Sequence, residues 1–300
     1  MQPNQYGLMI GLSKRSRYAV SAIREEDLLA EKLRSEGKAI IKLNIGDPAA
    51  YFPTPKYIID AYIEALKKGH TDYSYATGIP ELRKAIAKKY RERHGADFSE
   101  DDVVVTQGVS EALQFVNNSL IDPGEGAVLF TPYYAPYLSY LKLSGGEVVE
   151  GHYREEKNWD IDIDALDERL RSGKVKRHLK YLMVTNPNNP TGTVLRRKTL
   201  ESLVNLSNDH DLMLISDEIY DEIVFNGANF TSIAKLAKGT PHMIIHGASK
   251  CYDSTGFRLG FVIVPGEDKA STDVKRSLRD MANLRLSSNT PAQYAIAEAA

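Results

Sequence analysis

The chain has 300 residues, of which 42% are hydrophobic and 26% charged, and its formal net charge is −2. This length can bury a substantial core, and the near-neutral charge gives no electrostatic reason to expect nucleic acid or an anionic membrane as a partner. The single cysteine, Cys251, excludes an internal disulfide framework and is typical of a reducing compartment. The longest apolar runs are shorter than the roughly 20 residues of a membrane helix, and the first residues lack the order of a signal peptide. We therefore expect a cytoplasmic protein.

Five short apolar runs recur along the chain, and each ends in a cluster of polar or small residues. The runs span residues 103–106, 127–131, 181–185, 212–216 and 243–246. Continuous apolar runs of this length are typical of strands covered on both faces. The patterns of residues 79–95 and 197–211 predict helices, the first of which ends at Gly95. Strands that alternate with helices predict an α/β fold with a mainly parallel sheet.

The five polar clusters all follow the carboxyl ends of predicted strands, where ligands gather in parallel sheets. We therefore expect the clusters to converge in space. The last connection, from residue 247 to 258, is short for a crossover helix, and this favours an antiparallel strand at residues 261–264.

Lys250 lies in one of these clusters, directly after the small residues of GAS. The ordinary alternative is an exposed loop lysine, which is the commonest kind. Small neighbours, however, let a ligand approach the backbone closely, and a desolvated lysine has a lowered pKa and reacts with carbonyl groups. This interpretation requires a cofactor with a carbonyl group and an anion site nearby.

An anion site is predicted at the turn that follows residues 103–106. Gly108, Val109 and Ser110 stand where a strand passes into a helix, and a helix N-terminus offers free backbone N–H groups to a phosphate. The alternative is that Ser110 only caps its helix. Arg258, eight residues after the lysine, suits either a clamp on the same phosphate or a structural salt bridge.

Further candidates follow the other strands. Asp217 suits a protonated ring nitrogen, or else it caps a helix predicted at EIYDEI. Asn189 lies in NPNNPTG, whose two prolines and glycine fix the backbone, although the string is also ordinary turn chemistry. Tyr133 and Tyr134 offer aromatic faces for stacking, or else belong to the core or surface. Together with Lys250, these groups match a flat cofactor with an aldehyde, a phosphate, a pyridine nitrogen and a phenolic oxygen.

In these motifs the sequence resembles the class I and II aminotransferases, pyridoxal-phosphate enzymes of fold type I, and most of all the alanine aminotransferases of archaea and bacteria. The resemblance extends from LNIGDP at residues 43–48 to SSNTPAQ at residues 287–293. Its most specific parts are NPNNPTG, SDEIYD and the pair SK followed eight residues later by arginine, in that order. It implies a mainly parallel, seven-stranded type of sheet with helices on both faces, plus a small domain.

The resemblance also implies roles for the matching residues. Lys250 matches the lysine that is joined covalently to the aldehyde of pyridoxal phosphate, and Asp217 matches the aspartate that pairs with the pyridine nitrogen; these two are the implied catalytic residues. Asn189 and Tyr220 match the residues that hydrogen-bond the phenolic oxygen. The implied phosphate and other cofactor contacts are Gly108, Val109, Ser110, Ser249 and Arg258.

Four more positions are placed by the same resemblance. Tyr134 matches the aromatic residue stacked on the cofactor ring, with Tyr133 as the alternative because proline commonly follows that tyrosine directly. Tyr73 matches a tyrosine that reaches the phosphate of the neighbouring subunit, so a homodimer is implied. Gly46 matches a glycine whose backbone touches the substrate carboxylate. Gly247 departs from the family, because many members carry a phosphate-contacting serine there.

The resemblance divides the chain into three parts. Residues 1–45 are expected to form an N-terminal arm and the start of a small domain, residues 46–285 a large cofactor-binding domain, and residues 286–300 the start of a C-terminal small domain. Family members continue there with an arginine that grips the substrate α-carboxylate, and nothing in this chain matches it. We therefore expect that the sequence is partial.

The implied function is transfer of an amino group from an L-amino acid, with alanine favoured, to a 2-oxo acid such as 2-oxoglutarate. Aspartate or an aromatic amino acid is the alternative donor. A carbon–sulfur β-lyase shares every implied residue and stays open, as does a chain that binds the cofactor without turnover. No metal ion, nucleic acid or membrane partner is implied.

Overall fold

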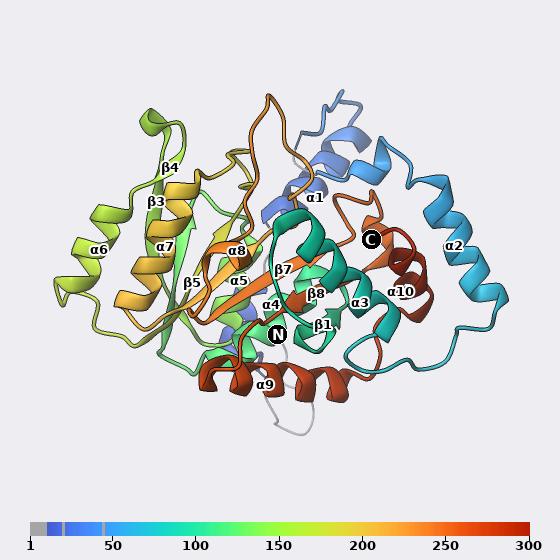
Figure 1. Ribbon diagram of the computed structural model, residues 1–300. Coiled ribbons are helices and arrows are strands. Elements are labelled where there is room, and N and C mark those ends of the chain that lie inside the picture. Colours follow the sequence, from blue (N-terminus) through green and yellow to red (C-terminus); the bar gives the residue numbers. More distant parts are fainter. Residues whose placement is uncertain (1–10, 20–21, 44–45) are drawn as a thin grey trace, which may run out of the picture.

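The computed structural model describes residues 11–19, 22–43 and 46–300, and its centre is one eight-stranded sheet with helices on both faces (Figure 1). The strands are β1 (Val103–Thr106), β2 (Gly126–Thr131), β3 (Glu147–Arg154), β4 (Asp160–Ile161), β5 (Leu179–Thr185), β6 (Met213–Asp217), β7 (His242–Gly247) and β8 (Gly260–Ile263). Their order across the sheet is β1-β8-β7-β6-β5-β2-β3-β4. The predicted α/β fold is confirmed, and the two-residue β4 is an addition to the predicted seven strands.

Six strands run in the same direction, so their carboxyl ends share one edge of the sheet. β2 pairs in parallel with β3 and β5, β5 with β6, and β6 with β7. β8 is antiparallel to both β7 and β1, as the short connection after residue 247 predicts, and β1 therefore has the direction of β7. The residues that precede β8 consequently reach the same edge as those that follow β7. We call this edge the carboxyl edge.

Ten α-helices surround the sheet within the described segments. They are α1 (Ala22–Ser35), α2 (Lys56–Lys67), α3 (Pro80–Lys89), α4 (Gly108–Leu120), α5 (Pro136–Leu143), α6 (Ile163–Arg171), α7 (Arg197–Asp209), α8 (Ile233–Leu236), α9 (Lys269–Arg285) and α10 (Thr290–Ala297). Short 3₁₀ helices lie at Lys14–Tyr18, Pro48–Ala50, Glu100–Asp102, Glu155–Lys157 and Thr255–Phe257. A π-helical turn, Tyr90–His94, continues α3 to Gly95, whose left-handed φ of 63° ends the helix where the sequence predicts. The other predicted helix, at residues 197–211, corresponds to α7.

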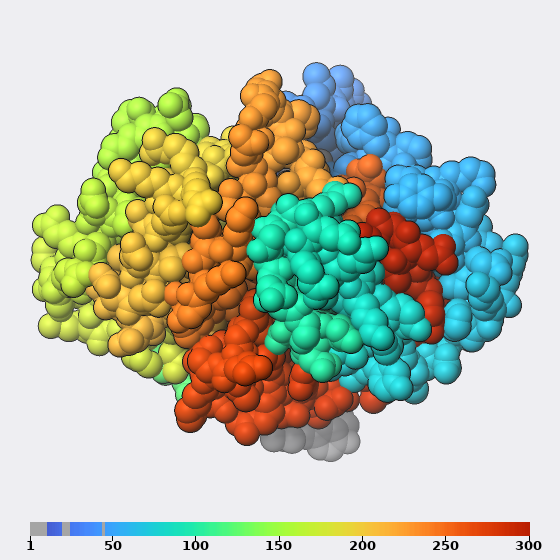
Figure 2. All heavy atoms as spheres, in the orientation of Figure 1, coloured from blue at the N-terminus to red at the C-terminus, as the bar shows by residue number. Residues whose placement is uncertain are grey.

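The strands alternate their side chains between two apolar layers. Val103 and Val105 of β1 face the layer that includes α3, α7 and α10, whereas Val104 faces the layer that includes α4, α5 and α9. α3 and α10 pack side by side on the face seen in the space-filling view (Figure 2). Coverage of both faces is the reason that the strands are continuous apolar runs in the sequence.

Three local expectations need correction. Residues 219–222 form turns rather than the helix predicted at EIYDEI, so Asp217 ends β6 and does not cap a helix. α4 begins at Gly108, so Ser110 lies inside its first turn and is not the cap. β3 is absent from the predicted strands because its buried and exposed residues alternate along most of its length, as on a half-exposed strand.

The helices of the described segments are all too short or too polar to cross a membrane. α10, which lies in the predicted start of the small domain, packs against α2 and α3 of the predicted large domain. The division of the chain at residues 45 and 285 stays a prediction.

Candidate active site

Lys250 lies at the carboxyl edge, in the turn that follows β7. Its Nζ donates a hydrogen bond to the carbonyl oxygen of Gly46 at 2.6 Å. Burial lowers the pKa of Lys250; the nearby Asp47 carboxylate opposes this shift, and the Arg258 guanidinium adds to it. A lysine with a lowered pKa more readily supplies the neutral amine that reacts with carbonyl groups or accepts a proton.

The N-terminus of α4 and Arg258 form a corner suited to an anion. Gly108 has a φ of +75°, and a Cβ added there would lie 2.6 Å from Nη2 of Arg258. Glycine is therefore needed both for the backbone conformation and for the approach of the guanidinium. Arg258 is exposed, has a left-handed φ of 53°, and donates from Nη1 to the carbonyl oxygen of Thr255 at 2.9 Å. The half-buried Val109 and Ser110 complete the helix turn, whose free N–H groups suit a phosphate.

Asp217 is the buried acid of the site, with 2% of its surface exposed. Its Oδ2 accepts a hydrogen bond from the hydroxyl of Tyr137 at 2.7 Å, and its Oδ1 accepts one from the backbone N–H of Ile219 at 3.1 Å. Burial raises the pKa of Asp217, and these two hydrogen bonds offset only part of that shift. A carboxylate held in this way is stabilised further by a cation, such as a protonated pyridine nitrogen.

Asn189 and Tyr220 are brought together by the turns that follow β5 and β6. Asn189 Nδ2 donates to the hydroxyl oxygen of Tyr220 at 3.2 Å. The turn around Asn189 is closed by a hydrogen bond from the N–H of Gly192 to the carbonyl oxygen of Asn188, at 2.9 Å. Burial, reinforced by the Asp217 carboxylate, raises the pKa of Tyr220 to about 12. Tyr220 therefore keeps its proton at neutral pH, and its hydroxyl and the Asn189 amide can both donate to a phenolic oxygen.

The two neighbouring tyrosines point to different partners. The hydroxyl of Tyr133 lies 3.5 Å from Oε1 of Glu150 on β3. The ring of Tyr134 packs edge-on against that of Tyr137, with ring centroids 5.4 Å apart, and Tyr137 in turn contacts Asp217. Of the two tyrosines, Tyr134 is thus the one on the Asp217 side.

Two residues of the site are absent from the predicted set. Tyr137 is buried, and its hydroxyl bridges Asp217 and Oγ1 of Thr185, the latter at 2.9 Å. Its available signal is its place as the third tyrosine of YYAPY, but the spacing alone does not show that it faces Asp217. Asp47 lies near Lys250 and accepts a hydrogen bond from Oγ1 of Thr255 at 2.9 Å; its signal is its position in NIGDP.

The remaining predicted residues differ in their placement. Ser249 is buried in the turn beside Lys250. Gly247 leaves no room for the serine of many family members, because a Cβ there would lie 2.8 Å from the carbonyl oxygen of Leu259. Tyr73 has 78% of its surface exposed, and its role toward a neighbouring subunit stays a prediction.

These groups fit pyridoxal phosphate by their chemistry. The amine of Lys250 suits an aldehyde, the corner of Gly108 and Arg258 suits a phosphate, and the Asp217 carboxylate suits a protonated ring nitrogen. The set lies at the carboxyl edge of a mainly parallel sheet, which is where such sheets bind their ligands.

The family is shown by comparison with known proteins. Residues 38–300 match the family described as "Aminotransferase class I and II", and the chain belongs to this family. The family takes its name from transaminases, and its members in general depend on pyridoxal phosphate. The predicted class of enzyme and its fold type are therefore confirmed.

Relatives named for two different amino donors are similar to this chain. It is 36% identical over 285 residues to the aspartate aminotransferase of Thermotoga maritima, covering 95% of this chain and 72% of that protein. It is 35% identical over 269 residues to an alanine aminotransferase of Mycobacterium tuberculosis, covering 89% and 61%. Among solved structures, the alanine aminotransferase of Pyrococcus furiosus has a TM-score of 0.90 at 38% identity, covering 96% and 72%. The aspartate aminotransferase of Thermus thermophilus with maleate has a TM-score of 0.85 at 33% identity, covering 97% and 73%.

Proposed function

We propose that the chain is a pyridoxal-phosphate-dependent aminotransferase that moves the amino group of L-alanine to 2-oxoglutarate. The observation that carries the proposal is the position of Lys250, a lysine with a lowered pKa at the edge shared by the Arg258 corner and Asp217. A solvent-exposed loop lysine would have none of these neighbours.

The proposed cofactor contacts follow from the donors and acceptors present. Arg258 and the first turn of α4 would hold the phosphate, with Ser249 beside them. Asn189 and Tyr220 would donate to the phenolic oxygen, and Tyr134 would lie against the ring. The remaining contact is the Asp217 carboxylate, which would keep the ring nitrogen protonated.

Lys250 is proposed to move the proton of the reaction. When bound, pyridoxal phosphate supplies an aldehyde that takes up the amino group and a ring that takes up the electron pair left at Cα. Lys250 Nζ would accept the proton from Cα of the amino acid as a general base and then, as a general acid, pass it to the carbon of the former aldehyde. The backbone of Gly46, which Lys250 already contacts, would lie beside the substrate carboxylate.

Alanine is the favoured donor, and aspartate is the second candidate. The Pyrococcus furiosus enzyme, whose title names alanine, is similar to this chain with a TM-score of 0.90 and 38% identity. The Thermotoga maritima relative, which is named for aspartate, has a similar identity of 36%. A few pocket contacts decide between such donors, so overall identity supports the reaction more strongly than the substrate.

A homodimer is part of the proposal. Tyr73 and Tyr75 expose 78% and 69% of their surfaces, and α2 exposes the apolar side chains of Tyr57, Ile63 and Leu66. A second copy of the chain would cover such surface and bring Tyr73 to its phosphate. We also propose a cytoplasmic location, which the use of a single cysteine supports.

The test is a panel of amino donors. The purified holoprotein is incubated with 2-oxoglutarate and each of alanine, aspartate, phenylalanine and cysteine, and glutamate and the new 2-oxo acid are measured. We expect alanine to give the highest kcat/KM, and the Lys250→Ala variant to lose activity by roughly 10³-fold or more.

The matched control is Lys84→Ala, which removes an exposed lysine on α3 and should keep full activity. Full activity in Lys250→Ala would overturn the assignment. Pyruvate released from cysteine without an acceptor, in the absence of glutamate formation, would instead favour the β-lyase reaction.

A further inference from the structure

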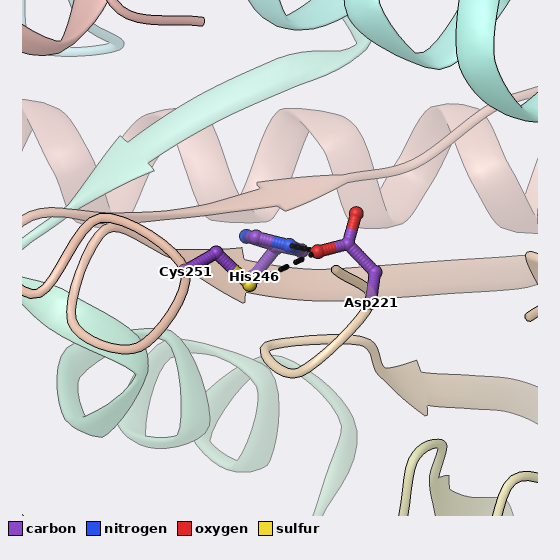
Figure 3. A group of neighbouring side chains, drawn as sticks. All are labelled: Asp221, His246 and Cys251. Carbon is purple, nitrogen blue, oxygen red and sulfur yellow. Dashed lines mark hydrogen bonds and ion pairs between the residues drawn. The ribbon is translucent and has the colours of Figure 1, made fainter. Parts of the chain in front are cut away.

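A second group of polar side chains lies next to the Lys250 turn, to which Cys251 belongs. Asp221, His246 and Cys251 point toward one another from three places in the chain (Figure 3). Asp221 Oδ1 accepts a hydrogen bond from His246 Nε2 at 2.8 Å and another from Cys251 Sγ at 3.3 Å. One carboxylate oxygen therefore holds two residues that flank the lysine.

These contacts are important because of where the three residues stand in the chain. His246 stands four residues before Lys250 and Cys251 directly after it, whereas Asp221 directly follows Tyr220. Cys251 Sγ also lies 3.3 Å from the carbonyl oxygen of Ile219, which is on the same segment as Asp221. The carboxylate thus joins the turn that carries the amine to the segment that carries Asp217 and Tyr220.

The histidine is held in one tautomer. Its Nδ1 accepts a hydrogen bond from the N–H of Gly247 at 2.7 Å, so the ring proton is on Nε2, where it is donated to Asp221. The ring also stacks on Phe261 of β8, with centroids 5.2 Å apart. Both ring nitrogens and one ring face of His246 are therefore engaged by its neighbours.

The other carboxylate oxygen faces a second set of partners. Oδ2 of Asp221 lies 3.1 Å from Nε2 of His94 and 3.9 Å from Nζ of Lys89. Burial alone would raise the pKa of Asp221, but His246, His94 and Lys89 hold it well below its usual range. Burial also raises the pKa of Cys251, which therefore stays a thiol donor.

A metal ion is a weaker interpretation of the same residues. The ligand atoms of Asp221, His246 and Cys251 lie within 4.8 Å of one another, which is close enough for shared coordination. The Lys89 ammonium near the same carboxylate, however, would repel a cation, and a metal-bound cysteine needs a thiolate rather than a thiol. In the hydrogen-bonded network, by contrast, Asp221 is a carboxylate and Cys251 is a thiol, the states that their pKa shifts favour.

We propose that Asp221 is a positioning residue which, through His246 and Cys251, fixes the Lys250 turn against the Asp217–Tyr220 segment. The inference rests on the proposed function, because it concerns where the amine stands relative to the groups that hold the cofactor. Reacting groups need to be held within about 0.5 Å, and a displacement of about 1 Å can lower a rate by roughly 10²-fold. The role of Asp221 is exerted through His246 and Cys251, which both donate hydrogen bonds to its Oδ1 (Figure 3).

The test uses the holoprotein and its bound cofactor as a spectroscopic probe. The pH at which the cofactor absorbance changes reports the surroundings of the Lys250 nitrogen, and kcat and KM are measured on the same samples. Asp221→Asn is expected to keep the cofactor, to move the absorbance midpoint by about half a pH unit or more, and to lower kcat roughly 10-fold with KM changed less than about threefold.

Two further variants keep the test informative if Asp221→Asn folds poorly. Cys251→Ala removes one donor to Asp221 and should shift the absorbance midpoint in the same direction by a smaller amount. Cys251→Ser retains a donor and should restore the midpoint toward that of the unchanged protein. If the absorbance midpoint of all three variants equals that of the unchanged protein, the positioning role is wrong.

Asp160→Asn is the matched control. Asp160 is also a buried carboxylate in a polar network, with Arg196 and with Oγ1 of Thr199 at 2.8 Å, but it lies on β4 at the far edge of the sheet. It should lose stability without moving the midpoint or kcat. If Asp221→Asn behaves like Asp160→Asn, the cluster is merely structural and the inference is wrong. An unchanged protein that shows no cofactor absorbance would overturn the proposed function itself.

Discussion

Asp217 and Asp221 stand four residues apart on one segment and are almost equally buried, with 2% and 3% of their surfaces exposed, yet their carboxyl groups respond in opposite ways. Burial raises the pKa of Asp217, whose hydrogen bonds come from the neutral Tyr137 hydroxyl and a backbone N–H. At Asp221 burial acts in the same sense, but His246, His94 and Lys89 reverse it and lower the pKa. The groups that face a carboxyl group, rather than its depth, therefore decide the direction in which its pKa moves.

The two aspartates also differ in the partners that the protein gives them. Each Asp221 oxygen already has protein partners: His246 on Oδ1, and His94 and the Lys89 ammonium on Oδ2. At the carboxyl edge, Asp217 is a buried acid that an added cation would stabilise. One short segment thus carries two aspartates: Asp221 has its charged and hydrogen-bonding partners within the protein, whereas Asp217 is suited to a cationic group of a ligand.

The largest expected effect is on turnover, from Asp217→Asn. Asparagine keeps the shape of the side chain but cannot hold a protonated ring nitrogen by charge, so we expect kcat to fall roughly 10² to 10³-fold. The free energy of unfolding of the cofactor-free protein should change by less than about 1 kcal/mol or rise, because a buried acid with a raised pKa is removed. Steady-state kinetics and urea unfolding measure the two quantities. A normal kcat would show that the pairing with the ring nitrogen is wrong.

Asp221→Asn should give the reverse balance, with the main effect on stability. Removing this buried charge weakens the ion pairing of Lys89, which then keeps only Glu222 among the described residues, and takes an anionic acceptor away from His246 and His94, so we expect a loss of about 3 kcal/mol in the free energy of unfolding at pH 7. Urea unfolding of the cofactor-free protein measures it. A loss below about 1 kcal/mol would mean that the histidines and Lys89 do not stabilise this charge.

The same variant has an expected pH dependence. The pKa of Asp221 is lower in the folded chain than the roughly 3.9 of an unfolded aspartate, so its stabilising contribution is fully present above that value. As the pH falls through and below about 4, the contribution of the carboxylate to the free energy of unfolding decreases. The difference in stability between Asp221→Asn and the unchanged protein should therefore shrink. A difference that grows as the pH falls would contradict the sign of the shift.

The contrast between the two aspartates also marks the limit of sequence reasoning. Residues 217 and 250 are predictable because each follows a continuous apolar run, and parallel strands bring such positions to one edge. Asp221 and Tyr137 are not predictable in this way, since their roles depend on which side chains face them from His246, His94 and Asp217. The helix predicted at EIYDEI fails for a related reason: residues 219–221 make contacts with Cys251, Asn189 and His246, and these tertiary contacts override the local pattern.

The smallest expected effect comes from Tyr137→Phe, which removes the hydroxyl that donates to Asp217. This hydrogen bond lowers the pKa of Asp217, so without it that pKa should rise and the acid limb of the kcat/KM profile should move to higher pH. The buried contact to Oγ1 of Thr185 is lost as well, and the free energy of unfolding should fall by about 1 kcal/mol. A pH profile from about 5 to 9, measured with the best donor, tests the first effect, and urea unfolding tests the second.

Tyr181→Phe is the matched control for this last variant. Tyr181 is another buried tyrosine, on β5, and its hydroxyl donates to Oδ1 of Asn117 at 2.9 Å on the layer away from α3 and α7. It should lose a similar amount of stability and leave the pH profile in place. If both variants move the acid limb equally, the shift reflects a general loss of core packing. If only Tyr137→Phe moves it, the ionisation of Asp217 depends on the neutral hydrogen-bond donors that face its carboxyl group.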